Sequence, residues 1–186
     1  IDMEIRITTS HMLKVLHVIV WIIFVGLCID AGGFLSNAVY VSTINPAYAK
    51  HFWLNNDFSV LYAFDKGHFL VQTMLISIVA IMKAIMFYMI VKLLYDKKLN
   101  LARPFNKEVR HFISLLSYLS LGIGLFAYAG VNYAERLMKQ GVIMPGIESL
   151  KLGGADVWLF MGIILLVIAQ IFKKGIEIQT ENELTV

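Results

Sequence analysis

Four long apolar stretches constrain this sequence more than any other feature. They occupy residues 15–41, 69–95, 112–133 and 157–172. A helix that crosses the hydrocarbon core of a bilayer needs about 20 apolar residues, because each residue adds 1.5 Å. The first three stretches reach that length, and the fourth reaches it when residues 153–155 are added. Helices are the expected structure, since unpaired main-chain groups cost several kcal/mol each in lipid.

The composition agrees with a membrane location. Of the 186 residues, 59% are hydrophobic and 16% are charged, whereas soluble domains average about 45–50% and about 25%. We therefore predict an all-α membrane protein with four transmembrane helices in an antiparallel bundle. The predicted spans are about 13–41, 62–95, 108–136 and 153–174, within a single domain 1–186 that ends in a cytoplasmic tail at 175–186. Asn106, followed by Glu108, predicts an N-cap with an acidic first turn for the third span.

The distribution of lysine and arginine predicts the orientation, because cytoplasmic flanks are enriched in both. Ten basic residues flank one side of the predicted spans: Arg6, Lys14, Lys92, Lys97, Lys98, Arg103, Lys107, Arg110, Lys173 and Lys174. Five flank the other side: Lys50, Lys66, Arg136, Lys139 and Lys151. Both termini are therefore expected in the cytoplasm. The net charge of +3 reflects the basic residues on the cytoplasmic side. The sequence has no basic stripe with interleaved aromatic residues, so we expect no direct binding to nucleic acid.

Two charged residues fall inside the predicted spans. Asp30 and Lys83 each cost about 2.5–3.5 kcal/mol near the centre of a bilayer, so both need partners. Along the second span, Asp65, Gln72 and Lys83 fall within about 20–40° of one another at 100° per residue. This polar stripe is expected to face other helices or a wet cavity. The candidate polar core therefore consists of Asp30, Lys83, Gln72, Asp65 and, from the first span, Asn37.

Two interpretations of these residues stay open at the level of sequence. In the first interpretation, Asp30 and Lys83 form a buried ion pair, or a hydrogen-bonded network with Gln72 and Asn37, and this contact only fixes the helix register. Alternatively, they line a binding cavity or a path for protons or ions. Small residues at Gly32 and Ser36, and at Ser120, Gly124 and Ala127, predict close helix packing, and contact with a second copy through the same faces stays open.

Histidine ligation of haem is a weaker hypothesis. His17 and His111 both lie near the predicted cytoplasmic interface, where facing histidines could hold a haem. Each is also within a turn of a basic flanking residue, where an interfacial histidine is ordinary. No metal-ligand spacing recurs on one helix, the single Cys28 excludes an internal disulfide, and no nucleophile with a positioned base is found. We therefore expect no cofactor, no metal and no enzyme activity.

Three stretches together resemble one bacterial family. They are WIIFVGLCIDAGG at 21–33, ARPFNKEV at 102–109 and QIFKKGIEIQTENELTV at 170–186. The chain is similar to members of the domain of unknown function 2975 family from about Met12 onward. The resemblance implies a four-helix inner-membrane protein with no established activity, catalytic residues or cofactor. Because relatives are often encoded beside a small helix-turn-helix repressor of the Cro type, it also implies a membrane partner in regulation or stress response.

These observations lead to an ordered set of functional hypotheses. The first is a non-enzymatic sensor or regulatory module of the bacterial inner membrane that binds a small apolar or amphipathic ligand. It signals through the cytoplasmic loop and tail to a cytoplasmic regulator protein. The second is a small transporter or channel that uses Asp30 and Lys83. A haem-binding protein is the third and least favoured. The lipid bilayer is the expected partner in every case.

Overall fold

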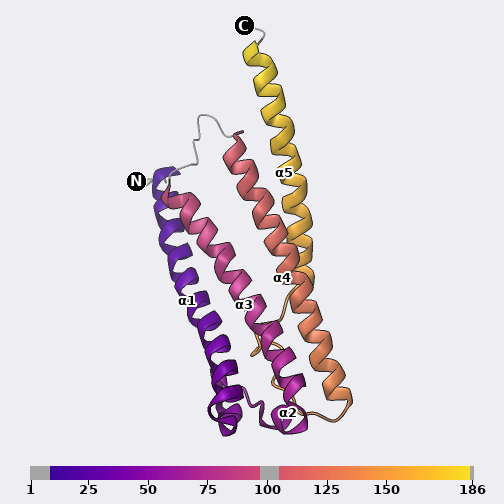
Figure 1. Ribbon diagram of the computed structural model, residues 1–186. Helices are drawn as coiled ribbons and strands as arrows, with labels where there is room; N and C mark the ends of the chain where they lie inside the picture. Colours follow the sequence, from indigo (N-terminus) through magenta and orange to yellow (C-terminus); the bar gives the residue numbers. More distant parts are fainter. Residues whose placement is uncertain (1–8, 97–104, 185–186) are drawn as a thin grey trace, which may run out of the picture.

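The computed structural model describes residues 9–96 and 105–184, and these residues are almost entirely helical (Figure 1). The elements, in chain order, are α1 (Thr9–Thr43), η1 (Pro46–His51), η2 (Trp53–Asn55), α2 (Ser59–Phe64), α3 (Lys66–Tyr95), α4 (Lys107–Lys139) and α5 (Ala155–Leu184). In this part of the chain no β-strand forms. The predicted all-α class is therefore confirmed.

Four of the helices are long and apolar enough to cross a membrane. They are α1, α3, α4 and α5, by length and composition. This confirms the number of spanning helices expected from the sequence. The fourth helix continues without a break through the segment that the sequence analysis set apart as a tail, and it ends at Leu184.

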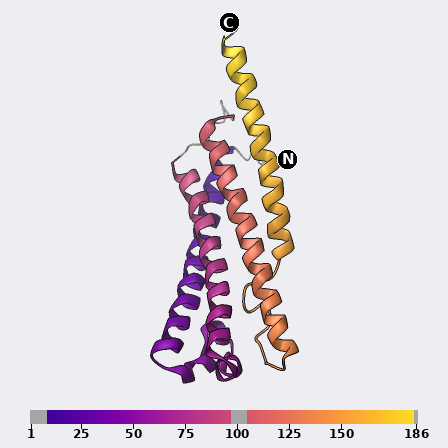
Figure 2. The ribbon, with the colours of Figure 1, turned by 45° about the vertical axis from the view of Figure 1, so that its right-hand side comes forward.

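The four long helices are arranged in a row. Helix α1 packs on α3, α3 packs on α4, and α4 packs on α5. The two views in Figures 1 and 2 show the same order. Because α1 packs mainly on α3 and α5 mainly on α4, most of their apolar surface is open to lipid or to other chains.

Side-chain caps set the start of two helices. The second predicted span, 62–95, is interrupted at Asp65, whose side chain accepts a hydrogen bond from the amide of His68 (2.8 Å) and caps α3. Asn106 caps α4 in the same way, through the amide of Val109 (2.7 Å), and Glu108 lies in the first turn. The N-cap predicted from the sequence is confirmed, since each carboxylate or amide oxygen satisfies a free amide of the first turn.

Helix α5 is shifted along its neighbour by a large part of its length. A side chain at Gly130 of α4 would meet Leu152, and one at Gly124 would meet Leu159. Helix α5 therefore begins between these two levels, part-way along α4. At the other end Gly175 lies against Phe105, just before α4 begins. The following nine residues of α5 extend ~14 Å beyond that level, and the projection is visible in Figures 1 and 2.

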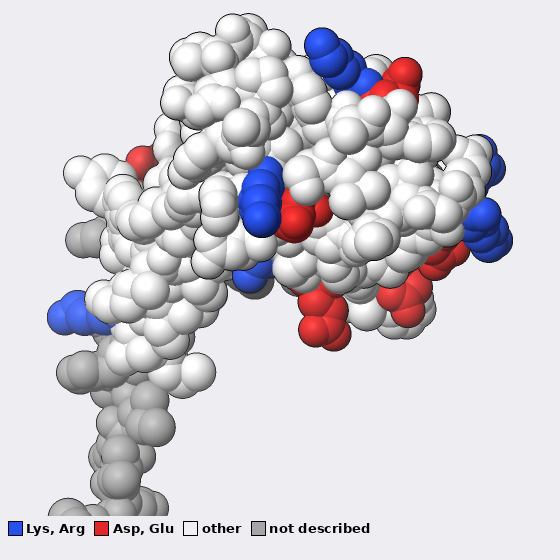
Figure 3. All heavy atoms as spheres, turned by 90° about the horizontal axis from the view of Figure 1, so that it is seen from below, with Lys and Arg blue, Asp and Glu red and all other residues white. Residues whose placement is uncertain are grey.

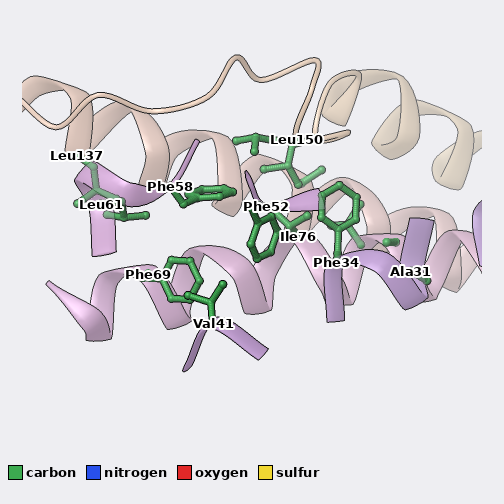
Figure 4. Packing of buried hydrophobic residues seen from close by; sticks show 14 of the residues in the cluster. Ala31, Phe34, Val41, Phe52, Phe58, Leu61, Phe69, Ile76, Leu137 and Leu150 are labelled. Atoms are coloured by element: carbon green, nitrogen blue, oxygen red, sulfur yellow. The ribbon is translucent and has the colours of Figure 1, made fainter. Parts of the chain in front are cut away.

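The best-packed part of the molecule lies where the connections return to the helices. Phe34 and Phe69 come from α1 and α3, and Phe52 and Phe58 come from the connection between them; all four are fully buried (Figure 4). Their rings meet edge to face at 5.0–6.0 Å in the Phe52, Phe58 and Phe69 group. The connection at residues 140–154 covers the same region with two fully buried leucines. This end of the molecule is therefore a compact cap.

Charged side chains of both signs surround this capped end. Viewed from below, blue and red side chains are scattered over a largely uncharged surface, some near its middle and others toward its edge (Figure 3). Six of the ten basic residues assigned to the cytoplasmic side lie in the described part of the chain, on the helices. The other four lie outside the described residues: Arg6, Lys97, Lys98 and Arg103.

Candidate functional site

Lys83 is held by the connection that leads into α5. Its ammonium group donates a hydrogen bond to the main-chain carbonyl oxygen of Lys151, at 2.9 Å. It also lies 5.6 Å from the centre of the Trp158 ring, in the first turn of α5. A cation over the face of an indole ring is attracted by its negative face. The amine of α3 therefore contacts the chain on both sides of the point at which α5 begins.

Asp30 is held by the other connection. The indole Nε1 of Trp53 donates a hydrogen bond to its carboxylate, at 3.2 Å. Trp53 reaches that position because Gly33, one turn further along α1, has no side chain; any Cβ atom there would collide with the ring. Both predicted intramembrane charges are thus bound to segments that connect helices, and each contacts a tryptophan.

Asp30 and Lys83 do not form a salt bridge. Each has the separate partner described above, and both side chains are half-buried. The carboxylate of Asp30 and the ammonium group of Lys151 nevertheless both act electrostatically on Lys83. The direct ion pair that the sequence analysis considered is therefore absent, since each charge is held by a residue of a connecting segment.

The three remaining candidates are not part of one site with them. Gln72 is fully buried and donates to the carbonyl oxygen of Gly130 at 3.4 Å, and its own Oε1 has no partner. Asp65 is exposed and caps α3. Asn37 donates to the carbonyl oxygen of Gly33 in its own helix, at 2.8 Å. These contacts fix helix ends and helix packing at separate places in the fold.

A separate cavity lies between α3 and α4, near the end of α3 and the start of α4. Its volume is about 360 Å³. Four charged or titratable residues line it, together with five apolar or aromatic ones: Lys92, Asp96, Glu108 and His111, and Tyr88, Met89, Leu93, Phe112 and Leu115. Ligand sites of this size are commonly apolar with a few polar groups. This cavity is a second candidate site.

Comparison with known proteins gives a family. Residues 36–186 match the family described as protein of unknown function, DUF2975. The chain belongs to the DUF2975 family. The match confirms the resemblance noted in the sequence, although the first of the three stretches that suggested it lies before the matched residues. No curated protein and no solved structure matches this DUF2975 protein.

The two histidines considered for haem are not brought together in this DUF2975 protein. His17 lies on α1, where its ring accepts a hydrogen bond from the indole of Trp21 at 3.1 Å. His111 lies on α4, and in the described part of the chain α1 and α4 share no contact. The geometry therefore gives no support to ligation of one haem by this pair.

The sequence analysis of the DUF2975 protein missed the partners of Lys83. Neither Trp158 nor the carbonyl oxygen of Lys151 is among the residues that the sequence analysis proposed for the polar core. A usable signal was present in the glycine pair at 153–154, since Gly154 adopts a positive φ of 75°. Such a pair marks a turn next to a helix start, and it places the preceding residues against α3.

Proposed function

We propose that this DUF2975 protein is a non-enzymatic sensor or regulatory module of the bacterial inner membrane. The proposed arrangement is an antiparallel four-helix bundle with both termini in the cytoplasm. The ratio of ten basic residues to five supports this orientation. Four of the six described members of the larger group lie where α1 begins, where α3 ends and where α4 begins, and the other two, Lys173 and Lys174, lie on α5. In this orientation the projecting end of α5 reaches into the cytoplasm.

One observation carries the regulatory role. Lys83 contacts Lys151 and Trp158, which flank the start of α5, and α5 then continues as one helix to Leu184. A continuous helix transmits a displacement of one end to the other, so release of Lys83 would move the projecting end. That end offers Glu177 and Glu181 to a cytoplasmic regulator protein. The proposed ligand of this module is a small apolar or amphipathic molecule.

Distance measurements in nanodiscs test the coupling. In a background with Cys28→Ser, spin labels are attached at Lys107→Cys on α4 and Lys173→Cys on α5, both exposed positions. We expect Lys83→Met to shift or broaden the distance distribution between the labels. Lys139→Met removes an exposed lysine from the end of α4 and is the matched control. An unchanged distribution with Lys83→Met would contradict the coupling.

A second candidate function is transport through the membrane. It is favoured by the half-buried Asp30 and Lys83, which are not neutralised by direct pairing. Unpaired ionisable groups inside a membrane often mark ion or substrate paths. Proteoliposome flux assays distinguish this function from the first. Transport predicts flux that is lost with Lys83→Ala and Asp30→Asn, whereas a sensor predicts no flux in any of these proteins.

A further inference from the structure

Asp30 and Lys83 lie at the same level of neighbouring helices. Helices α1 and α3 pack together and are joined at the capped end, so they run in opposite senses, and the rings of Phe24 and Tyr88 lie 5.9 Å apart further along. From that ring contact toward the capped end, Asp30 lies ~9 Å along α1 and Lys83 lies ~8 Å along α3. The carboxylate also acts electrostatically on the ammonium group. The two opposite charges therefore face the same region of the molecule.

Each of these charges has hydrogen-bonding capacity that its partner does not use. Asp30 accepts a hydrogen bond from the indole of Trp53 through Oδ1, and the ammonium group of Lys83 donates to the carbonyl oxygen of Lys151. Within residues 9–96 and 105–184, neither group has a further hydrogen bond. One carboxylate oxygen and two ammonium hydrogens are therefore available to a ligand, at a depth where charged groups are normally paired.

The face of α1 that carries Asp30 is filled on one side and open on the other. Residues three and four apart share a face of a helix, so Gly33 and Gly26 lie on either side of Asp30. A Cβ atom at Gly33 would collide with the ring of Trp53, whereas one at Gly26 would meet nothing within 4 Å. The carboxylate therefore has an indole ring on its capped side and open space on the other.

The connection before α5 brings water-exposed groups to the same depth. It descends along α4, since Leu152 lies against Gly130, and the side chain of Lys151 is exposed. Irregular backbone at membrane depth is tolerated only where it is buried in protein or lines a water-filled cavity. The exposure of Lys151 favours water, and water gives a polar molecule a route from the capped end to Lys83.

We infer that Asp30 and Lys83 together bind a small zwitterion of the betaine class, with its carboxylate at Lys83 and its quaternary ammonium group at Asp30. A primary ammonium group would bring three N–H donors to the single free oxygen of Asp30. A quaternary ammonium group needs no acceptor, presents methyl groups to apolar neighbours, and is attracted by an indole ring such as that of Trp53.

The pair of opposite charges selects a zwitterion over a simple ion. An anion is attracted by Lys83 and repelled by Asp30, and for a cation the signs are reversed. A zwitterion gains at both positions and adds no net charge to the membrane interior, where an uncompensated charge is costly. Identification of this small amphipathic molecule as the ligand that is sensed or transported rests on the proposed function, whereas its binding is measured without flux or movement of α5.

Competition binding to the wild-type protein tests the ligand class. Radiolabelled glycine betaine is bound to the full chain in nanodiscs and displaced by unlabelled compounds. Choline lacks the carboxylate, 3,3-dimethylbutanoate has a neutral tert-butyl group in place of the quaternary ammonium group, and glycine has a primary ammonium group. We expect each to compete at least about tenfold more weakly than glycine betaine, in line with the loss of one charged contact. Absence of saturable betaine binding, or equal competition by all three compounds, would overturn the inference.

Charge variants test the two residues. Asp30→Asn and Lys83→Met should each lower the affinity for glycine betaine at least about tenfold. Asp156→Asn and Lys139→Met, which remove exposed charges elsewhere, are the matched controls and should bind as the wild-type protein does. Wild-type affinity in both Asp30→Asn and Lys83→Met would contradict the assignment.

A steric variant tests the open space without changing a charge. Gly26→Leu fills the space beside Asp30 and should lower the affinity about tenfold. Gly32→Leu is the control, because a side chain there also meets nothing within 4 Å but lies 200° around α1 from Asp30, at 100° per residue. Equal affinities in these two variants would place the ligand elsewhere.

The outcomes separate this site from the proposed function. Betaine binding without flux and without a change in the spin-label distances would leave the site standing and count against betaine as the sensed or transported ligand. Altered spin-label distances in Lys83→Met, together with no betaine binding by the wild-type protein, would overturn the betaine site alone.

Discussion

The ammonium group of Lys83 donates a hydrogen bond to the main-chain carbonyl oxygen of Lys151, 68 residues further along the chain. The contact joins the middle of α3 to the segment that precedes α5. It therefore fixes the position at which α5 begins. Lys151 lies outside the helices, so its carbonyl oxygen accepts no helical hydrogen bond, and the ammonium group of Lys83 supplies the donor instead.

Lys83→Met should loosen the start of α5 with little change in global stability. Loss of a hydrogen bond from a charged donor costs about 1.5–3 kcal/mol, but removal of a charge from the membrane recovers about 2.5–3.5 kcal/mol. The two effects oppose each other, so the melting temperature should change by a few degrees at most. Amide hydrogen exchange at residues 150–158 should accelerate about tenfold.

The control for this variant is Lys92→Met, on the opposite face of α3. It removes a lysine of the same helix without touching the connection before α5, and exchange at residues 150–158 should stay at the wild-type rate. Equal exchange in wild-type protein and Lys83→Met would show that the hydrogen bond to Lys151 does not hold this segment.

Gly33→Ala should displace Trp53 and destabilise the capped end. A methyl group at Gly33 would overlap the indole ring, whereas one at Gly32 would meet nothing within 4 Å. The hydrogen bond from Trp53 to Asp30 should break, and overpacking of this kind costs about 1–3 kcal/mol. Thermal unfolding in detergent measures the loss. Gly32→Ala, one residue earlier, is the control and should unfold at the wild-type temperature; similar losses in both variants would contradict the packing described for Trp53.

Much of the architecture could be predicted from the sequence because it depends on local composition. Four apolar stretches predicted four helices, and Asn106 predicted the start of one of them, since a cap involves residues only three positions apart. The polar stripe expected at Asp65, Gln72 and Lys83 has no common environment in the structure, since Asp65 is the exposed N-cap that precedes α3 and Gln72 is fully buried within it. Its three members have three unrelated partners, because each level of the face meets a different neighbour.

The partners of the charged residues could not be predicted for a physical reason. They depend on where the irregular connections return, and the hydrogen bond from Trp53 to Asp30 joins residues 23 apart through a path that no periodicity encodes. The shift of α5 along α4 could not be predicted from the sequence either. It is set by the close approach of Gly124 to Leu159, and a glycine on an apolar helix is compatible with many registers.

Gly162→Ala should separate α4 from α5. A Cβ atom at this position would lie 3.0 Å from the main-chain nitrogen of Leu121, which cannot move as a side chain can. The carbonyl oxygen of Gly162 also accepts a hydrogen bond from Ser117, at 2.8 Å, and this bond should lengthen. We expect a loss of about 1–3 kcal/mol in thermal unfolding. Gly26→Ala on α1 meets nothing within 4 Å and should have no comparable effect; if it is equally damaging, close packing is not the cause.

The carboxyl group of Asp57 should titrate at a lower pH than an ordinary aspartate. It lies in the connection before α2, outside the spanning helices, and accepts hydrogen bonds from the Ser59 hydroxyl and the Ser59 amide (2.9 Å). The hydroxyl contact is the main reason that the pKa of Asp57 lies below its usual value of 3.8, and the amide adds to it. Because the folded-state pKa is depressed, the stabilisation is present above the unfolded-state pKa and is lost as the pH falls through the folded-state pKa.

An NMR titration of the carboxyl carbon of Asp57 in detergent micelles measures this pKa. Ser59→Ala removes the hydroxyl and keeps the amide, so the midpoint should move up toward that of an ordinary aspartate without reaching it. The effect on global stability should be small, since the carboxylate is exposed and solvent screens it. Ser149→Ala, which removes a hydroxyl from the other connection, should leave the Asp57 midpoint unchanged. Identical midpoints in the wild-type protein and Ser59→Ala would mean that the hydroxyl does not stabilise the charged form.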